Sequence, residues 1–179
     1  MDILAENKSI MMLHKDIAKT PAYRLEDDYS IRFFRPGDDQ AWIDIHKLAD
    51  RWNEVGETQF ENAFGDYPLS LEERQLYLLN SRDETIGTAT AWQREMDGKM
   101  YGLLHWVAIH PDYQGKGLAK PLLSATCSLF RKLGYREVFL NSSTARLPAI
   151  DLYRKFGFEP LIRNAAEEEI WQLLQSHLH

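Results

Sequence analysis

The chain is poor in cysteine and contains no long apolar run. Cys127 is its only cysteine, so it can form no intramolecular disulfide and offers no pair of thiolates to a metal ion. Near the amino terminus the longest apolar run is Ile10 to Leu13, which is too short for the core of a signal peptide or for a membrane span. These absences predict a cytoplasmic protein that has no membrane partner.

An excess of basic residues is also missing. The 179 residues include 21 Lys and Arg against 27 Asp and Glu, which gives a formal net charge of −6 at pH 7. Proteins that bind nucleic acid neutralise its phosphates with a concentrated basic surface. Nucleic acid is therefore not expected as a partner.

Internal repeats and low-complexity segments are absent as well. A chain of this length with 44% hydrophobic residues can bury one sizeable core. Residues 1–29 mix charge with weak helical spacing of apolar residues, so we expect a partly helical N-terminal extension. The domain proper is expected to occupy residues 30–179 and to end in a helix capped by Asn164.

Apolar periodicity predicts an α/β fold. Strand patterns occupy residues 31–35, 75–80, 85–92, 101–109, 138–140 and 158–162. Asp97-Gly98 is a hairpin signal. Helical patterns follow Asp38, which is expected to cap the first helix, and then Gly117 and Pro148. Antiparallel strands come first and are followed by strand, helix, strand and helix. This order predicts a mixed, mainly antiparallel sheet flanked by helices.

A glycine-rich turn follows the buried strand pattern at 101–109. Between His110 and Ala119 the sequence places Gly115 and Gly117 just before a helix. Such a turn directs free backbone N–H groups and the positive end of the helix dipole at one point, which suits a pyrophosphate. Taken alone, Gly-x-Gly is just as typical of an ordinary turn, and it matches neither the dinucleotide fingerprint nor the nucleoside triphosphate loop.

Two blocks of the sequence resemble the GNAT superfamily of acetyl-coenzyme-A-dependent N-acetyltransferases. Gln114, Gly117 and Ala119 match the family pattern Gln/Arg-x-x-Gly-x-Gly/Ala. About thirty residues later, Ala149 to Phe158 is similar to the family's Ala-x-x-Leu-Tyr-x-Lys-x-Gly-Phe. The resemblance covers roughly residues 31–162. It implies a GNAT-like sheet whose central strands splay apart to bind acetyl-coenzyme A.

The resemblance also implies which residues contact the cofactor. The backbone of Val107 and Ile109 would hydrogen-bond the pantetheine arm, as an added strand does at the edge of a sheet. Asn141 is a further expected contact, because Arg146 stands where many members have an asparagine. The pyrophosphate would lie on Gln114, Gly115, Lys116, Gly117, Leu118 and Ala119.

Tyr153 and His105 are the expected catalytic residues. Tyr153 corresponds to the family's general acid, which protonates the departing thiolate; the alternative is a core tyrosine with a satisfied hydroxyl. An alkyl ammonium must lose a proton before it attacks, and His105 is the best candidate for the base because imidazole side chains in general titrate near neutral pH. The serotonin N-acetyltransferase branch also carries histidine in this strand. A structural histidine and a water chain remain the alternatives to His105 as the base.

The resemblance implies direct acetyl transfer from acetyl-coenzyme A to a primary amine, without a metal ion, and we favour a small-molecule amine over a protein amine. Two other interpretations stay open: a non-catalytic acyl-coenzyme A sensor, and an interaction module using Trp171, Leu173 and Leu174. The last helix can pack on its own sheet or on a second copy, so a homodimer is one arrangement left open. An acidic stretch between Asn53 and Glu73 either attracts a cationic amine or is a solvated face. Its acids are Glu54, Glu57, Glu61, Asp66, Glu72 and Glu73.

Overall fold

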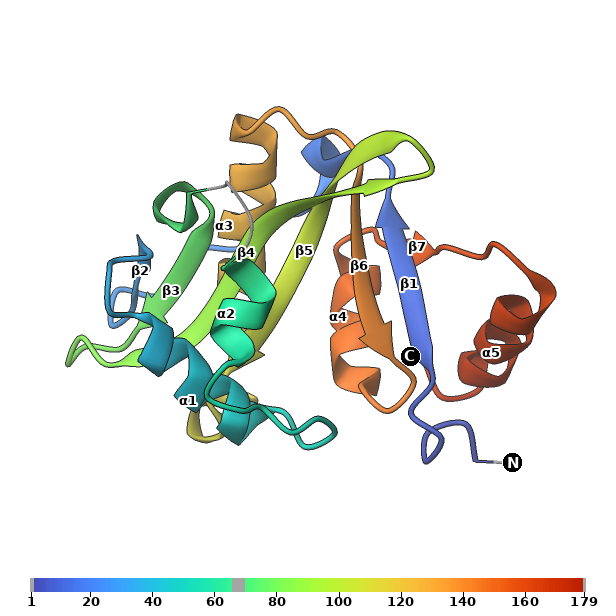
Figure 1. The fold of residues 1–179 in the computed structure, drawn as a ribbon, viewed down its shortest axis with the longest axis horizontal. Helices are drawn as coiled ribbons and strands as arrows, with labels where there is room; N and C mark the ends of the chain where they lie inside the picture. Colours follow the sequence, from blue (N-terminus) through green and yellow to red (C-terminus); the bar gives the residue numbers. More distant parts are fainter. Residues whose placement is uncertain (1, 66–69, 179) are drawn as a thin grey trace. The chain divides into compact units, whose positions relative to one another are not determined.

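The computed structural model describes residues 2–65 and 70–178 (Figure 1). In these residues the sheet has the strand order β2-β3-β4-β5-β6-β1-β7. Its strands are β1 (Ser9–His14), β2 (Ser30–Phe33), β3 (Gln75–Leu79), β4 (Thr85–Met96), β5 (Lys99–Ile109), β6 (Val138–Ser143) and β7 (Glu159–Pro160). The α-helices are α1 (Asp39–Ala49), α2 (Gln59–Phe64), α3 (Ala119–Lys132), α4 (Leu147–Lys155) and α5 (Ala165–Gln175).

The sheet is mixed and mainly antiparallel, as the sequence predicts. The pairings of β1 with β6 and β7, of β2 with β3, and of β3 with β4 are antiparallel. β5 and β6 pair in parallel through Gly102–Leu104 and Val138–Leu140. A parallel pair needs a crossover, and α3 lies between these two strands in the sequence.

The chain divides into two compact units built from separated segments. The first comprises residues 1–21, 93–104 and 130–179, and the second comprises residues 22–92 and 105–129. In the described ranges, no helix is both long enough and apolar enough to cross a membrane.

The first unit corrects the expectation of a partly helical N-terminal extension. Residues 9–14 form β1, which pairs along its length with β6 and lies between β6 and β7 (Figure 1). Ile10, Met12 and His14 are buried, whereas the residues between them are more exposed, so the segment has the two-residue period of a strand. Ile17–Lys19 forms a short helical turn. A six-residue strand depends on distant partners, and local apolar spacing does not reveal them.

Asp38 precedes α1 as predicted but does not cap it. No hydrogen bond joins its side chain to the first turn of the helix. Its carboxylate accepts two hydrogen bonds from Arg32, at 2.6 and 2.8 Å, and one from the N–H of Arg35 at 2.6 Å. A bidentate, charge-assisted pair is stronger than the hydrogen bond of a helix cap. The Asp38 carboxylate therefore binds the arginine on β2 and not the first turn of α1.

Other local signals are confirmed. Asp97 and Gly98 have φ of 53° and 75°, as a two-residue hairpin turn between β4 and β5 requires. The side chain of Asn164 caps α5 by accepting from the N–H of Glu167 at 3.0 Å. β6 runs three residues beyond its predicted end, whereas β7 is only two residues long and includes Pro160, which lacks a donor for a longer ladder.

Candidate active site

Five consecutive backbone amides precede or open α3 without a protein acceptor. Within residues 2–65 and 70–178, no protein group accepts a hydrogen bond from the N–H groups of Gly115 to Ala119, and the next amide, that of Lys120, donates to Gly117 at 3.2 Å. Gly115 and Gly117 have φ of 76° and 78°, which favours glycine, and no atom lies within 4 Å of where a Cβ would stand. Together with the helix dipole, these amides form a cradle suited to an anion.

Two side chains fix the shape of this cradle. Gln114 donates from Nε2 to the carbonyl oxygen of Ile109 at 2.9 Å, which ties the turn to the end of β5. His110 accepts from the N–H of Asp112 at its Nδ1, at 3.2 Å. The side-chain N–H of Gln114 is therefore engaged with the strand, and the residue positions the loop whose backbone forms the cradle.

Two lysines lie over aromatic rings beside the cradle. The Nζ of Lys116 is 4.6 Å from the ring centroid of Tyr113, and the Nζ of Lys120 is 5.3 Å from that of Tyr23. Tyr23 also donates its backbone N–H to the hydroxyl of Ser124 on α3 at 2.9 Å. These cation–π contacts hold positive charge near the start of α3. The sequence indicated Lys116, but not the tyrosine whose ring it contacts.

Tyr153 lies on α4 in the first unit and is 9% exposed. Its ring meets that of Phe158 edge-on, with centroids 6.1 Å apart. In the described part of the chain its hydroxyl has no hydrogen-bond partner. Burial raises the pKa of Tyr153 to about 12, so the phenol keeps its proton near neutral pH. The assignment of Tyr153 as the general acid stays a prediction.

β5 is interrupted at Trp106. This residue has a φ of 50°, although it lies inside the strand and is not glycine. Such a backbone costs about 1–3 kcal/mol and persists only when its surroundings hold it. In a regular strand His105 and Val107 would share one face, and the positive φ of Trp106 between them breaks that alternation. The ring of His105 lies edge-on to Phe64 and Trp106, with both centroid distances 5.9 Å.

A profile of the Acetyltransferase (GNAT) family matches residues 39–158, which is more than half of the chain. The chain belongs to this acetyltransferase family. The family profile contains both the cradle and the block around Tyr153, so the resemblance seen in the sequence is confirmed.

Individual GNAT relatives support the same assignment. Mycothiol acetyltransferase of Amycolatopsis mediterranei is 28% identical over 165 residues, which cover 87% of this chain and 55% of that protein. The protein of the same name from Saccharomonospora viridis is 30% identical over 154 residues, with 78% and 48% covered. The chain thus spans about half the length of these relatives. A GCN5-related N-acetyltransferase from Sphaerobacter thermophilus has the same fold, with a TM-score of 0.70 at 22% identity and with 86% and 48% covered.

The sequence missed His46 in this GNAT domain. It lies one helical turn after Trp42 on α1, and the two ring centroids are 4.2 Å apart. Both residues are buried, and both also approach the ring of Trp106, at 5.0 Å. Its spacing of four residues from Trp42 was the available signal, because such residues share a helix face.

Aromatic residues of the acidic stretch belong largely to the same core. Phe60 and Phe64 on α2 lie 5.4 and 5.6 Å from Trp42, whereas Trp52 is 49% exposed. One of the acids singled out in the sequence, Asp66, lies outside the described residues. The other five acids are exposed, and one of them, Glu57, pairs with Lys47. Their exposure fits a solvated acidic face.

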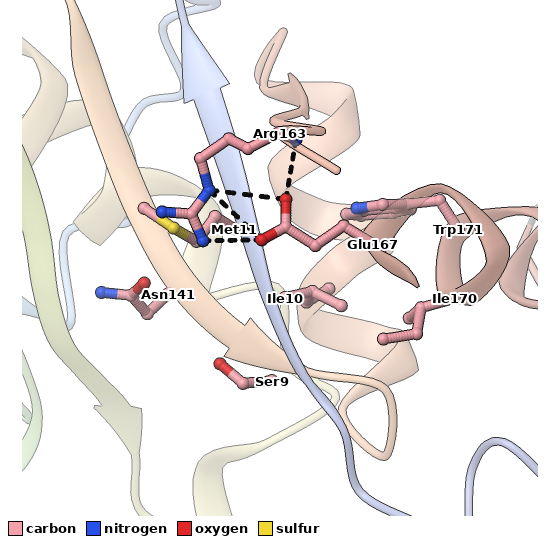
Figure 2. A pocket seen from close by; sticks show the side chains of 8 residues that line it. All are labelled: Ser9, Ile10, Met11, Asn141, Arg163, Glu167, Ile170 and Trp171. Atoms are coloured by element: carbon pink, nitrogen blue, oxygen red, sulfur yellow. Dashed lines mark hydrogen bonds and ion pairs between the residues drawn. The ribbon is translucent and has the colours of Figure 1, made fainter. Parts of the chain in front are cut away.

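Asn141 lies on β6 opposite Met11 of β1. Figure 2 shows its side chain at a cavity shared with β1 and residues at and before α5. Its role in binding the cofactor stays a prediction.

Proposed function

We propose that this domain transfers the acetyl group of acetyl-coenzyme A directly to the primary amine of a small molecule. The observation that carries the proposal is the row of five amides at the start of α3 for which the described residues supply no acceptor. Buried or converging backbone donors normally have partners, so such a row requires either water or an anionic ligand. In a GNAT domain the matching ligand is the pyrophosphate of the cofactor.

The residues around the cradle fit this cofactor. The open space at the Cβ positions of Gly115 and Gly117 lets a phosphate approach the backbone. Lys116 adds positive charge to the same loop. We assign the backbone of Val107 and Ile109, in the last part of β5, to the pantetheine arm, which would add to the strand through main-chain hydrogen bonds.

Tyr153 is the general acid in this proposal. The amine nitrogen attacks the thioester carbonyl, a C–N bond forms, and the tetrahedral intermediate then breaks its C–S bond. The thiolate that leaves takes the proton of the Tyr153 hydroxyl. The raised pKa keeps this phenol protonated until the C–S bond breaks, and no hydrogen bond to the described residues engages its hydroxyl. Solvent then returns a proton to the tyrosinate.

His105 is proposed as the base that takes the proton from the attacking amine. Its ring is partly exposed, and it lies in β5 next to the irregular residue Trp106. A neutral imidazole accepts a proton near neutral pH, which this step requires. A water chain ending on the same ring would serve equally, and variants at His105 test both arrangements.

A small-molecule acceptor is supported by the relatives. Two of them carry the name mycothiol acetyltransferase, at 28% and 30% identity. At this identity the acceptor itself is not transferable, because a few side chains in a pocket decide substrate choice. We therefore propose the class of acceptor and not its identity.

Calorimetric titration with acetyl-coenzyme A is the experiment that tests the proposal. The wild-type protein should bind saturably, and Gly117→Trp should abolish binding because its side chain fills the cradle. Gly37→Trp is the matched control, since Gly37 also has a positive φ of 97° and open space at its Cβ but lies in the turn before α1. The proposal would be contradicted by a folded wild-type protein that binds no acetyl-coenzyme A.

Binding alone does not show transfer, so a second measurement follows. Thiol release from acetyl-coenzyme A is recorded with spermidine, glucosamine and alanine amide as primary amines. Release that depends on one of these amines supports the enzyme. Tight cofactor binding without transfer to any amine would instead favour the non-catalytic sensor.

A further inference from the structure

A cavity of about 300 Å³ lies in the first unit, where β1 and β6 meet the residues around the start of α5 (Figure 2). Its volume is at the lower end of the ~300–1,000 Å³ range of small-molecule sites, which suits a single ring. Polar groups enter it from both strands and from the helix, and apolar side chains form the remaining wall.

A fixed ion pair forms one side of the cavity. Arg163 donates from Nη2 to Oε1 of Glu167 at 2.6 Å and from Nε at 3.2 Å, and its backbone N–H donates to Oε2 at 2.8 Å. Glu167 donates its own N–H to Asn164, so the pair is built into the cap of α5. The hydrogen bonds from Arg163 lower the pKa of Glu167, which keeps the carboxylate ionised.

This pairing determines which groups remain for a ligand. Both oxygens of Glu167 already accept hydrogen bonds, so the carboxylate has little capacity left for a cation. The Nη1 of Arg163 has no partner among the residues that the structure describes. The opposite charges of Arg163 and Glu167 cancel. The Nη1 of Arg163 therefore offers the cavity a hydrogen-bond donor without adding net charge.

Two further polar groups reach the cavity from the strands. Asn141 on β6 and Ser9 on β1 are both exposed. Asn141 lies directly opposite Met11, and Ser9 is two residues before Met11 on β1, so Asn141 and Ser9 lie on the same face of the sheet. For residues 2–65 and 70–178, no protein partner is recorded for either side chain. The amide supplies donors and an acceptor, and the hydroxyl supplies both.

The wall is apolar and partly aromatic. Ile170 and Trp171 line it from α5, and Figure 2 shows the indole nitrogen of Trp171 on the side of Glu167. A ligand that fills the cavity thus needs an apolar face for this wall and oxygens for the donors opposite. Charged groups gain little here, because both Glu167 oxygens already accept hydrogen bonds and the Arg163–Glu167 pair carries no net charge.

We propose that this cavity binds a neutral, hydroxyl-rich ring of the saccharide class. Ring hydroxyls accept from Arg163 and Asn141 and donate to the hydroxyl of Ser9, while the C–H face of the ring lies against Ile170 and Trp171.

The test is a titration of isotope-labelled protein with methyl glucoside, followed by amide correlation spectra in the absence of acetyl-coenzyme A. The side-chain amide of Asn141 and the indole N–H of Trp171 should shift saturably. Asn141→Ala removes one hydrogen-bonding group and should weaken binding about five- to tenfold. Ile170→Trp should abolish binding by filling the cavity. Gln172→Ala is the matched control, because Gln172 is exposed on the same helix and does not line the cavity.

Three results would overturn the proposal. They are the absence of saturable shifts at the highest soluble sugar concentration, unchanged binding by both cavity variants, and tighter binding of spermidine or glutamate than of the sugar. Calorimetry with acetyl-coenzyme A separates this failure from that of the proposed function, since the two ligands are titrated independently. Loss of acetyl-coenzyme A affinity in Asn141→Ala would make Asn141 a cofactor contact and remove it from the sugar site.

Discussion

The imidazole of His46 meets the indole of Trp106 edge-on, with ring centroids 5.0 Å apart. Trp106 is the residue whose φ of 50° interrupts β5. The strained residue is thus held from α1 by a buried histidine. Because β5 contains the proposed cofactor contacts Val107 and Ile109, the packing of α1 supports the geometry of the strand that would bind pantetheine.

His46 is expected to make the protein sensitive to acid. Burial lowers its pKa to about 3, whereas an unfolded histidine has a pKa near 6.5. Between these values the unfolded state binds a proton that the folded state does not. Stability is therefore fully present above about pH 6.5 and falls by up to ~1.4 kcal/mol for each pH unit below it. Urea unfolding from about pH 7 down to about pH 4 measures this slope.

His46→Phe should flatten that acid decline, because phenylalanine keeps a ring against Trp42 and Trp106 but binds no proton. It also removes the buried Nε2, which has no hydrogen-bond partner. The remaining slope in the variant comes from other groups, including His14, whose pKa burial also lowers. Parallel curves for the two proteins would contradict the role given to His46.

Tyr153→Phe should lower kcat about 10²- to 10⁴-fold, because the thiolate then leaves without its proton donor. The KM for acetyl-coenzyme A should change little, since the hydroxyl acts on the sulfur only as the C–S bond breaks. Initial rates of thiol release, with an amine that the wild-type protein accepts, measure both quantities. Tyr135→Phe is the control, as its hydroxyl donates to Gln93. Full activity in Tyr153→Phe would reject the acid role.

Gly117→Ala is expected to lower both the stability of the protein and its affinity for acetyl-coenzyme A, whereas Gly37→Ala should lower the stability alone. Alanine at a φ of 78° is strained by about 1–2 kcal/mol, but no protein atom opposes its Cβ. The same methyl group enters the cradle and should lower affinity for acetyl-coenzyme A roughly tenfold, through longer hydrogen bonds. Gly37→Ala carries comparable strain at a φ of 97° and should leave that affinity unchanged. Equal losses of affinity in both variants would count against the cradle.

Arg32→Leu should lower the free energy of unfolding by about 1–3 kcal/mol, because Asp38 then loses two hydrogen bonds. Burial alone raises the pKa of Asp38, but the hydrogen bonds and charges of Arg32 and Arg35 lower it overall. The pair therefore stabilises the protein above the unfolded pKa, and this gain is lost as the pH falls through the folded value. Thermal unfolding measures the change. Partial recovery in Arg32→Leu/Asp38→Asn is the internal check.

Short-range patterns in the sequence determined much of this protein. Gly115 and Gly117 specify a turn that few other residues could form, and the start of α3 follows from it. The turn at Asp97-Gly98 and the cap at Asn164 are equally local, since each depends on one or two backbone conformations. The GNAT family follows from two such blocks in order, because the two together are far more specific than either block alone.

Only the tertiary structure decided the features that depend on distant partners. β1 is a strand because β6 and β7 supply its hydrogen bonds. The Asp38 side chain does not cap α1 because it pairs with Arg32 of β2. Likewise, the positive φ of Trp106 has no sequence signature and is offset by packing from α1. The cavity at Asn141 joins residues more than 130 positions apart in the chain, from Ser9 to Arg163. Such contacts depend on how strands pair and helices pack, which local propensity does not specify.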